Sequence, residues 1–332
     1  MKAIVSKSVG GPDSLVLEES PEPEPRPDEV RVRVHACGVN YPDTLIIEDK
    51  YQFKPDRPFS PGGEVAGEID AIGSEVDSLA VGDKVIALVG WGGMAEKVVT
   101  KATKCLPMPT DMPFDEAAAF IFTYGTSYYA LKQRGSLKQE QTLLVLGAAG
   151  GVGLAAVELG VAMGATVVAA ASTQAKVDLA IKHGAASGVV YPTGTLDKAA
   201  AKALAGEFKQ STGKAGADVI YDAVGGDYAE AALRAIAWEG RFLVIGFPAG
   251  IPSIPLNLAL LKGCQIVGVF WGSFAERDPV ESQQNGRELV ELYANGNIRP
   301  YISARYPLAD AGRAISDLAE RRAMGKVVVT ID

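Results

Sequence analysis

The stretch LVLGAAGGVGLAAVELGVAMGATVVAAAS (144–172) constrains the fold more than any other part of the chain. It begins as a short apolar run of strand length, passes through a glycine-rich turn, and continues as a helix-like segment that leads into a second apolar strand. A strand, a helix and a second strand in this order form a βαβ unit, which places the two strands parallel in one sheet. The sequence therefore predicts an α/β domain built around these residues.

The alternation of strand-like and helix-like segments continues after this stretch. The strand-like runs SGVVY, ADVIYDAVG and GRFLVIGF are separated by helix-like segments such as QAKVDLAIKHGA and YAEAALRAI. Regular alternation of this kind predicts a doubly wound parallel sheet with helices on both faces, the Rossmann arrangement. The first hundred residues instead read as β-rich, with VRVRVHACGVN, EVAGEIDAIG and GDKVIAL as short strands and the acidic, proline-rich SPEPEPRPDE (20–29) as a solvated connection.

Composition narrows the class of function. The 332 residues exceed one ordinary core and suggest two domains. The net charge of −8 argues against a nucleic-acid partner, because phosphate binding needs clustered Lys and Arg. The three cysteines are widely spaced, which favours a reducing, cytoplasmic location over a disulfide framework. No apolar run is long enough to predict a membrane span, and no segment resembles a signal peptide.

The glycine turn predicts a dinucleotide site. A turn between a strand and a helix gathers backbone N–H groups at the positive end of the helix dipole, and this combination binds pyrophosphate. The residues that align with the G-x-G-x-x-G fingerprint begin at Ala148, which takes the place of the first glycine. We expect the cofactor to contact Ala149, Gly150, Gly151, Val152 and Gly153.

The end of the second strand favours NADPH over NADH. An NAD site carries an acidic residue about 20 positions after the glycines, and it binds the ribose 2′-hydroxyl. This chain has Ser172 and Thr173 there, and the first acidic residue is Asp178. Ser172 and Lys176 can bind a 2′-phosphate, and Tyr191 can close the same pocket. Taken alone, Lys176 is better explained as an exposed helix lysine, and Ser172 together with the missing acidic residue favours the phosphate site.

Five motifs carry a resemblance that covers nearly the whole chain. They are GVNYPDTL (38–45), SPGGEVAGEIDAIGSEV (60–76), GDKV (82–85), GAAGGVG (147–153) and DAVGG (222–226). The chain thereby resembles the medium-chain dehydrogenase/reductase superfamily, and within it the zinc-independent NADPH:quinone oxidoreductases, the ζ-crystallin-like group. The resemblance implies an α/β protein with a GroES-like β-rich catalytic domain (1–125 and 263–332) and an inserted Rossmann NADPH-binding domain (126–262).

The resemblance also locates the positions that hold catalytic zinc in related alcohol dehydrogenases. Here they are Asn40, Gly63 and, less surely, Phe122, none of which is a usual zinc ligand. No cysteine-bearing structural zinc lobe follows GDKV. We therefore predict no metal. Alcohol oxidation needs a Lewis acid, whereas an electron-poor acceptor delocalises the charge that it receives. A quinone is the expected substrate, with α,β-unsaturated carbonyls (an enone or an acryloyl-CoA-like thioester) as the alternative and a non-catalytic NADPH-binding protein as a second alternative.

The family positions suggest roles for single residues. The Asn40 amide is expected to face the nicotinamide or the substrate carbonyl. Asp43 either orients its loop or binds the nicotinamide ribose, and it serves equally well as a helix cap. Tyr51 is either a proton donor or a surface aromatic on a mobile loop. Further residues expected to border the cofactor are Thr126, Val224, Gly246, Phe247, Phe270, Trp271 and Lys326.

By analogy, we expect a homodimer. The run IPLNLALLKGCQIVGVF (254–270) can build an edge strand that continues into a second copy. The expected partners are then a small electrophilic acceptor and the second copy of the chain, with no nucleic acid and no membrane.

Overall fold

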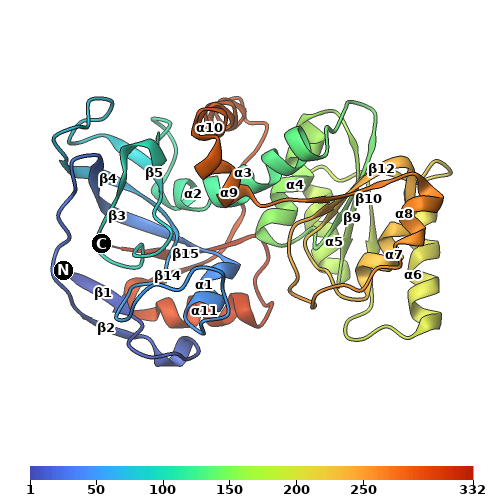
Figure 1. Cartoon of the computed structure of the whole chain (residues 1–332), viewed down its shortest axis with the longest axis horizontal. Helices are drawn as coiled ribbons and strands as arrows, with labels where there is room; N and C mark the ends of the chain where they lie inside the picture. The colour runs from blue at the N-terminus through green and yellow to red at the C-terminus, as the bar shows by residue number, and fades with distance from the viewer. Residues whose placement is uncertain (332) are drawn as a thin grey trace. The chain divides into compact units, whose positions relative to one another are not determined.

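The structure is a computed structural model, and it describes residues 1–331. The chain divides into two compact units. The first, here called the β-rich unit, comprises Met1–Thr123, Gly286–Ala294 and Arg299–Asp332; the second, the parallel-sheet unit, comprises Tyr124–Asn285 and Asn295–Ile298. Figure 1 shows both units and labels most of their helices and strands with the names used below.

The β-rich unit holds a seven-stranded sheet and a separate two-stranded sheet. Its strands are β1 (Lys2–Val5), β2 (Val16–Glu19), β3 (Glu29–Val39), β4 (Glu64–Ile72), β5 (Lys84–Leu88), β6 (Lys97–Lys101), β7 (Cys105–Pro107), β14 (Ile302–Pro307) and β15 (Lys326–Thr330). Its helices are α1 (Tyr41–Ile46), α2 (Phe114–Ala118) and α11 (Ala311–Ala319), with single 3₁₀ turns at Pro12–Ser14, Ala102–Lys104 and Leu308–Asp310.

The long strand β3 organises this sheet. Val30, Val32 and Val34 alternate with polar residues along it and are buried, as the sequence pattern predicts. One edge of β3 pairs with β4, and the other pairs first with β6 and then with β15. Because β15 comes from the end of the chain, residues more than 280 positions apart become neighbours in one sheet. The C-terminal tail thus completes the β-rich fold, which confirms the predicted GroES-like class.

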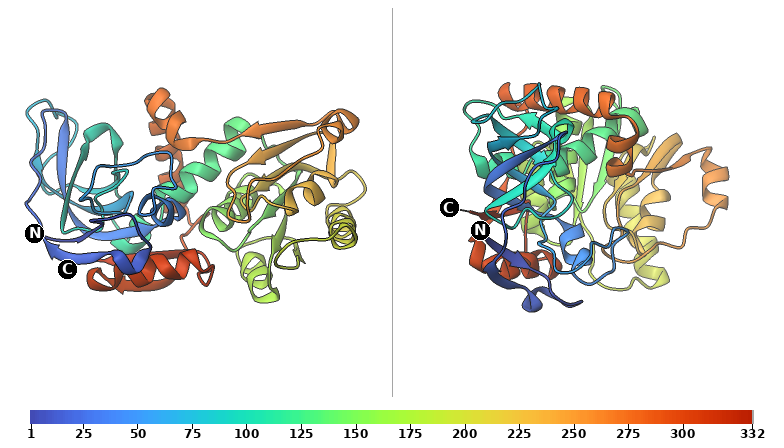
Figure 2. Two further views of the ribbon diagram at one scale, coloured as in Figure 1. Left: turned by 60° about the horizontal axis from the view of Figure 1, so that its bottom comes forward. Right: turned by 60° about the vertical axis from the view of Figure 1, so that its left-hand side comes forward.

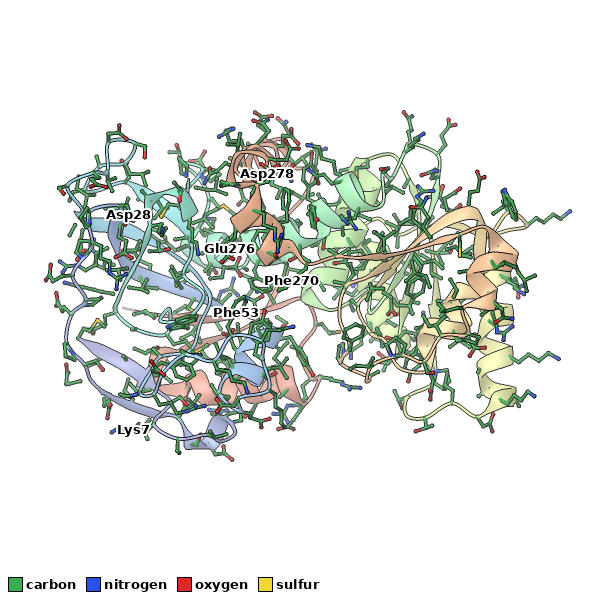
Figure 3. All side chains as sticks on the ribbon, viewed as in Figure 1. Lys7, Asp28, Phe53, Phe270, Glu276 and Asp278 are labelled. Atoms are coloured by element: carbon green, nitrogen blue, oxygen red, sulfur yellow. The ribbon has the colours of Figure 1, made fainter. Side chains whose placement is uncertain are left out.

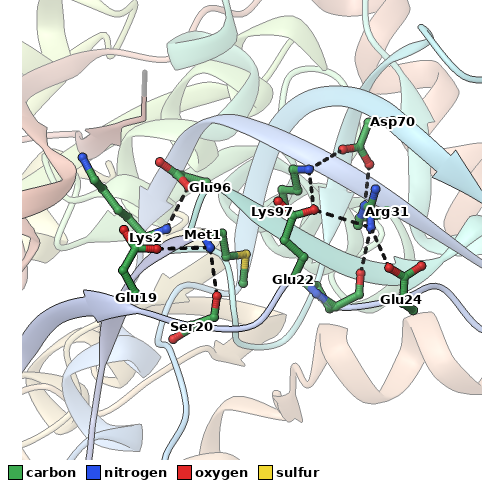
Figure 4. Close-up of polar contacts among 11 residues, drawn as sticks. Met1, Lys2, Glu19, Ser20, Glu22, Glu24, Arg31, Asp70, Glu96 and Lys97 are labelled. Atoms are coloured by element: carbon green, nitrogen blue, oxygen red, sulfur yellow. Dashed lines mark hydrogen bonds and ion pairs between the residues drawn. The ribbon is translucent and has the colours of Figure 1, made fainter.

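The acidic, proline-rich segment 20–29 is attached to the sheet by ion pairs (Figure 4). Lys97 of β6 lies 2.6 Å from Glu22 and 3.2 Å from Asp70 of β4. Arg31 of β3 lies 2.7 Å from Asp70 and 3.3 Å from Glu24. The prediction of a merely solvated connection misses this anchoring, because these basic partners lie on strands whose pairing the local sequence does not reveal.

The parallel-sheet unit holds one six-stranded sheet. Its strands are β8 (Thr142–Leu146), β9 (Thr166–Ala171), β10 (Ser187–Val190), β11 (Ala217–Asp222), β12 (Ile236–Val244) and β13 (Gln265–Gly268). Its helices are α4 (Gly151–Ala162), α5 (Gln174–Lys182), α6 (Lys198–Ser211), α7 (Tyr228–Leu233), α8 (Asn257–Lys262) and α9 (Trp271–Arg277). Helices α3 (Ile121–Tyr129), which continues as a π-helical turn at Ala130–Arg134, and α10 (Pro279–Ala294) contribute residues to both units.

The strand order of this sheet is β10-β9-β8-β11-β12-β13, and all neighbouring strands are parallel. The order reverses between β8 and β11, which creates the crevice where ligands of doubly wound sheets bind. Leu204 and Phe208 of α6 and Leu233 of α7 pack in one core cluster with side chains of the sheet. The helices and strands of this unit can be followed in Figures 1 and 2. The predicted Rossmann class is confirmed.

The boundary between the units differs from the predicted one over residues 263–285. The sequence analysis assigns this segment to the β-rich domain. In the structure it belongs to the parallel-sheet unit, because β13 forms hydrogen bonds with β12 and becomes the edge of that sheet.

Candidate active site

The glycine turn connects β8 to α4 in the parallel-sheet unit. Gly147 has φ +72°, a left-handed conformation that favours glycine. Gly153 is needed for close packing, since a Cβ there would lie 2.1 Å from the carbonyl oxygen of Gly147. Gly150 is exposed and caps α4 without a side chain, so the first N–H groups of the helix have no capping group. These N–H groups, next to an exposed glycine that lets a ligand come close, are suited to bind a pyrophosphate.

The turn lies at the point where the strand order reverses. Leu146 of β8 pairs with Asp222 of β11, and a Cβ on Gly147 would lie 3.0 Å from Val224. Asp222 is buried, and its carboxylate accepts hydrogen bonds of 2.9 Å from the backbone N–H groups of Val224 and Gly225. Burial raises the pKa of this carboxyl. Asp222 therefore shapes the loop that brings Val224 beside the glycine turn.

The loop after β12 lies against the same crevice. The carbonyl oxygen of Val224 accepts a 2.9 Å hydrogen bond from the backbone of Ala249. A Cβ on Gly225 would lie 3.2 Å from Phe247, whose ring is exposed. Gly246 precedes Phe247, and a Cβ at Gly246 would lie 3.9 Å from the ring of Pro248. The structure thus brings Val224, Gly246 and Phe247 together, as predicted from their positions at strand ends.

Two polar side chains meet just after the end of β9. The Nζ atom of Lys176 lies 3.5 Å from Oγ of Ser172, and Thr173 caps α5 by accepting a hydrogen bond from the Lys176 backbone. The backbone N–H of Tyr191 donates to the carbonyl oxygen of Ala171, which places Tyr191 beside the same strand end. The Tyr191 ring is buried and packs on Tyr228. Ser172 and Lys176 therefore lie together, whereas Tyr191 is beside them through its backbone and directs its ring to Tyr228.

Helix α3 carries Thr126 between two well-packed neighbours. Gly125 faces the indole ring of Trp271, and a Cβ at this glycine would lie 2.6 Å from it. Trp271 is buried at the start of α9, whereas Phe270, labelled in Figure 3, is half exposed. Trp271 thus has a packing role whether or not it borders a cofactor.

The β-rich unit holds a buried polar cluster around Asn40, which follows β3 and caps α1. The amide nitrogen of Asn40 donates to the carbonyl oxygen of Gly38 (3.2 Å) and to Oε2 of Glu64 (3.0 Å). The amide oxygen accepts a hydrogen bond of 2.7 Å from Nζ of Lys326. Since both N–H donors are engaged, the Asn40 amide has no hydrogen left for an outside carbonyl.

Lys326 belongs to this cluster rather than to the parallel-sheet unit. Its ammonium group contacts the carbonyl oxygen of Val39 (3.1 Å), Oδ1 of Asn40 (2.7 Å) and Oε2 of Glu64 (3.3 Å). These three acceptors match the three donors of an ammonium group. Glu64 is fully buried, and its second oxygen accepts a hydrogen bond from the backbone of Phe122. The Lys326–Glu64 ion pair therefore joins β3, β4, β15 and the start of α3.

Asp43 is a buried residue in the first turn of α1, and its side chain connects two backbone segments. Its carboxylate accepts hydrogen bonds from the backbone of Asn40 (2.7 Å) and of Gly62 (3.0 Å). Burial raises the pKa of Asp43 to about 6. These contacts fit the capping and loop-orienting interpretations of Asp43.

Tyr51 lies on the loop after α1, half-buried against the core and edge-on to Phe53, which Figure 3 labels. Burial raises the pKa of the Tyr51 phenol, and the nearby Asp43 carboxylate raises it further. The phenol therefore keeps its proton at neutral pH, as a proton donor must.

The three positions that correspond to the zinc ligands of related alcohol dehydrogenases all lie in or next to the Asn40 cluster. Asn40 and the backbone of Phe122 both donate to Glu64, and Gly63 directly precedes it. Within residues 1–331, no three His, Cys, Asp or Glu side chains are grouped so that they could hold a metal ion.

Glu64 is the residue of this centre that the sequence analysis missed. The only signal is a charged residue at the first position of an apolar strand, EVAGEI, directly after two glycines. Charged residues at strand ends are mostly exposed, so this signal is weak.

Comparison with known proteins agrees with this architecture. A family model described as "Alcohol dehydrogenase GroES-like domain" matches residues 26–110, and one described as "Zinc-binding dehydrogenase" matches residues 151–291. A "Quinone oxidoreductase-like protein 2 homolog" of Nematostella vectensis is 37% identical over 99% of this chain and 88% of its own length. A quinone oxidoreductase of Pseudomonas aeruginosa is 35% identical over 99% of both chains.

Solved structures share the whole fold. A mycobacterial protein complexed with NADPH superposes with a TM-score of 0.91 at 30% identity, over 99% of each chain. The Escherichia coli quinone oxidoreductase complexed with NADPH gives a TM-score of 0.89 at 28% identity, over 99% of this chain and all of that one. The fold, the glycine turn and these similarities over the full length together show that the chain belongs to the quinone oxidoreductase family of the medium-chain dehydrogenase/reductase superfamily.

Proposed function

We propose that this protein is an NADPH-dependent, zinc-free oxidoreductase that transfers hydride to a quinone. The observation that carries the cofactor choice is the end of β9, where Ser172 and Lys176 lie together and where the sequence has no acidic residue before Asp178. Asp178 follows Lys176 by two residues in α5, and its carboxylate accepts a hydrogen bond from Gln174. When bound, NADPH supplies the hydride, and the protein supplies binding and orientation.

The polar cluster around Asn40 supports an acceptor that needs no Lewis acid. In that cluster the Lys326–Glu64 ion pair lies where related alcohol dehydrogenases hold zinc. Lys326 donates to the Asn40 amide oxygen, and Glu64 accepts from the backbone of Phe122. A quinone accepts hydride into a conjugated system that delocalises the charge. We propose that Asn40 and Asp43 hold the loop beneath the acceptor site without contacting the acceptor themselves, and that Tyr51 delivers the proton, with solvent as the alternative source.

Reduction of an α,β-unsaturated carbonyl compound is the second candidate. It needs the same hydride and the same proton donor, and the names of the relatives favour the quinone. A non-catalytic NADPH-binding role is the third. Steady oxidation of NADPH in the presence of an acceptor distinguishes both enzymes from this role.

The deciding experiment compares NADPH and NADH oxidation against 1,4-benzoquinone, 9,10-phenanthrenequinone, a simple enone and crotonyl-CoA. Turnover of NADPH with the quinones supports the proposal. Turnover only with the enone or thioester moves the activity to carbon–carbon double bonds, and tight NADPH binding without turnover supports the non-catalytic role. Metal analysis that finds stoichiometric zinc after chelation contradicts the zinc-free mechanism.

We also propose that the protein is a cytoplasmic homodimer that pairs through β13. This strand is the edge of the parallel sheet, and its Ile266 side chain is exposed. Leu260 and Leu261 of the adjacent α8 are 78% and 65% exposed, which is unusual for leucine. A Leu260→Asp/Leu261→Asp variant should sediment as a monomer, whereas Val9→Asp, at an exposed valine of the β-rich unit, should not change the assembly. No helix within residues 1–331 is long and apolar enough to cross a bilayer.

A further inference from the structure

A buried chain of hydroxyl groups connects helix α3 to the glycine turn. The Oγ atom of Ser127 donates a 2.8 Å hydrogen bond to the carbonyl oxygen of Val152, in the first turn of α4. The same Oγ lies 2.9 Å from the phenolic oxygen of Tyr221 in β11. Both side chains have an exposed fraction of 0%. The predicted function uses neither of them.

The direction of this chain follows from the number of hydrogens. A serine hydroxyl has one hydrogen, and Ser127 gives it to Val152. The phenol of Tyr221 must therefore be the donor in its contact with Ser127. Burial raises the pKa of this phenol, so it retains the proton that it donates. The order of donation is Tyr221 to Ser127 to the backbone of Val152.

The acceptor at the end of this chain belongs to a functional peptide group. The carbonyl of Val152 and the N–H of Gly153 lie in one rigid peptide plane. The Gly153 N–H is one of the first-turn donors of α4, which have no partner within the helix. A hydrogen bond that fixes the Val152 carbonyl thus also fixes the direction of a donor that is available to a pyrophosphate.

Two further contacts hold α3 in the same register. The phenol of Tyr124 donates a 2.5 Å hydrogen bond to Glu158 of α4, and Gly125 packs on Trp271. Thr126 lies between these anchored residues and Ser127, and it is partly exposed. The first part of α3 and the first turn of α4 therefore form one fixed body.

We propose that Tyr221 and Ser127 are positioning residues for the pyrophosphate of the cofactor, acting through the peptide group of Val152 and Gly153. The inference rests on the proposed binding of NADPH. It predicts that loss of either hydroxyl weakens binding of the pyrophosphate and leaves binding of the adenosine 2′-phosphate at Ser172 and Lys176 unchanged.

The test measures dissociation constants of the full-length protein for two ligands by calorimetry. NADPH contains the pyrophosphate, and adenosine 2′-monophosphate lacks it. For Ser127→Ala and Tyr221→Phe, the Kd of NADPH should rise about two- to tenfold, the range expected for one hydrogen bond, while the Kd of adenosine 2′-monophosphate stays at the wild-type value. A role in stability alone would move both constants together or neither.

Thr212→Val is the matched control. The Thr212 hydroxyl is also buried and donates a 2.8 Å hydrogen bond to a helix carbonyl, that of Phe208 near the end of α6, away from the glycine turn. This variant should leave both constants unchanged. Equal weakening of both ligands, or no change in NADPH binding in folded Tyr221→Phe and Ser127→Ala proteins, overturns the inference. A wild-type protein that binds neither ligand contradicts the proposed cofactor itself, and the inference falls with it.

Discussion

The Nζ atom of Lys326 lies 2.7 Å from Oδ1 of Asn40, although 286 positions separate the two residues in the chain. The same ammonium pairs with Glu64, and all three side chains are buried. A buried ion pair gains little net stability as a pair, but removal of one partner leaves an uncompensated charge in the interior. The Asn40 centre therefore depends on both partners being present.

Lys326→Met should destabilise the protein by about 3–5 kcal/mol, because it leaves the Glu64 carboxylate buried without its cation. Urea unfolding followed by circular dichroism measures this change. The control is Lys101→Met, which removes an exposed ion pair with Asp28 and should cost less than about 1 kcal/mol. Similar losses in the two variants would contradict the proposed importance of the buried pair.

Asp43 should make stability depend on pH near pH 6. Its pKa in the folded state, about 6, is above the ordinary 3.8, so the native state binds the proton more tightly than the unfolded state does. The stabilisation that the protonated Asp43 adds to the folded state is therefore complete below about pH 4 and is lost as the pH rises through 6. The free energy of unfolding of the wild type, measured relative to Asp43→Asn, should be about 1 kcal/mol lower at pH 7 than at pH 5. A difference that is constant with pH, or that grows as the pH rises, would show that Asp43 is ionised throughout.

Lys176→Ala should raise the Kd of NADPH about tenfold and leave that of NADH unchanged, since only NADPH carries the 2′-phosphate that the ammonium would bind. Fluorescence titration with the two cofactors gives both values. Lys182→Ala, at an exposed position near the other end of α5, is the matched control for the loss of one positive charge. If the two substitutions raise the Kd of NADPH equally, the cause is the lower overall charge of the protein and not a contact between Lys176 and the 2′-phosphate.

Gly153→Ala should destabilise the parallel-sheet unit and weaken dinucleotide binding. A Cβ at this position would lie 2.1 Å from the carbonyl oxygen of Gly147, so α4 must move away from β8, at a cost of about 1–3 kcal/mol. Gly206→Ala is the opposite case, because the same atom in α6 meets nothing within 4 Å. It should stabilise the protein by about 0.5–1 kcal/mol. Thermal unfolding of both variants tests these two expectations. Destabilisation by Gly206→Ala would contradict the argument that the space around each glycine determines the cost of an added Cβ.

Tyr51→Phe should lower kcat by about 10²-fold and leave the Kd of NADPH unchanged, if the phenol donates the proton. Tyr41→Phe, which removes an exposed hydroxyl of α1, is the control and should retain full activity. Equal rates in the two variants would assign the proton to solvent.

The sequence by itself determined the features that depend on neighbouring residues. The glycine turn, the alternation of strands and helices, and the missing acidic residue after Ala171 are local patterns, and they were enough to predict the Rossmann class and the proximity of Ser172 and Lys176. Likewise, the alternating valines of β3 predicted its buried face, because residues on one face of a strand recur every second position.

Only the tertiary structure decided which distant side chains became partners. Lys326 meets Glu64 because β15 and β4 pair with opposite edges of β3, and nothing in either strand specifies that pairing. In the same way, Tyr221 reaches Ser127 because β11 lies beside β8 and α3 packs near the glycine turn. Once a buried charge or hydroxyl is withdrawn from water it must find a partner in the folded chain, and packing of the whole sheet determines which partner is within reach.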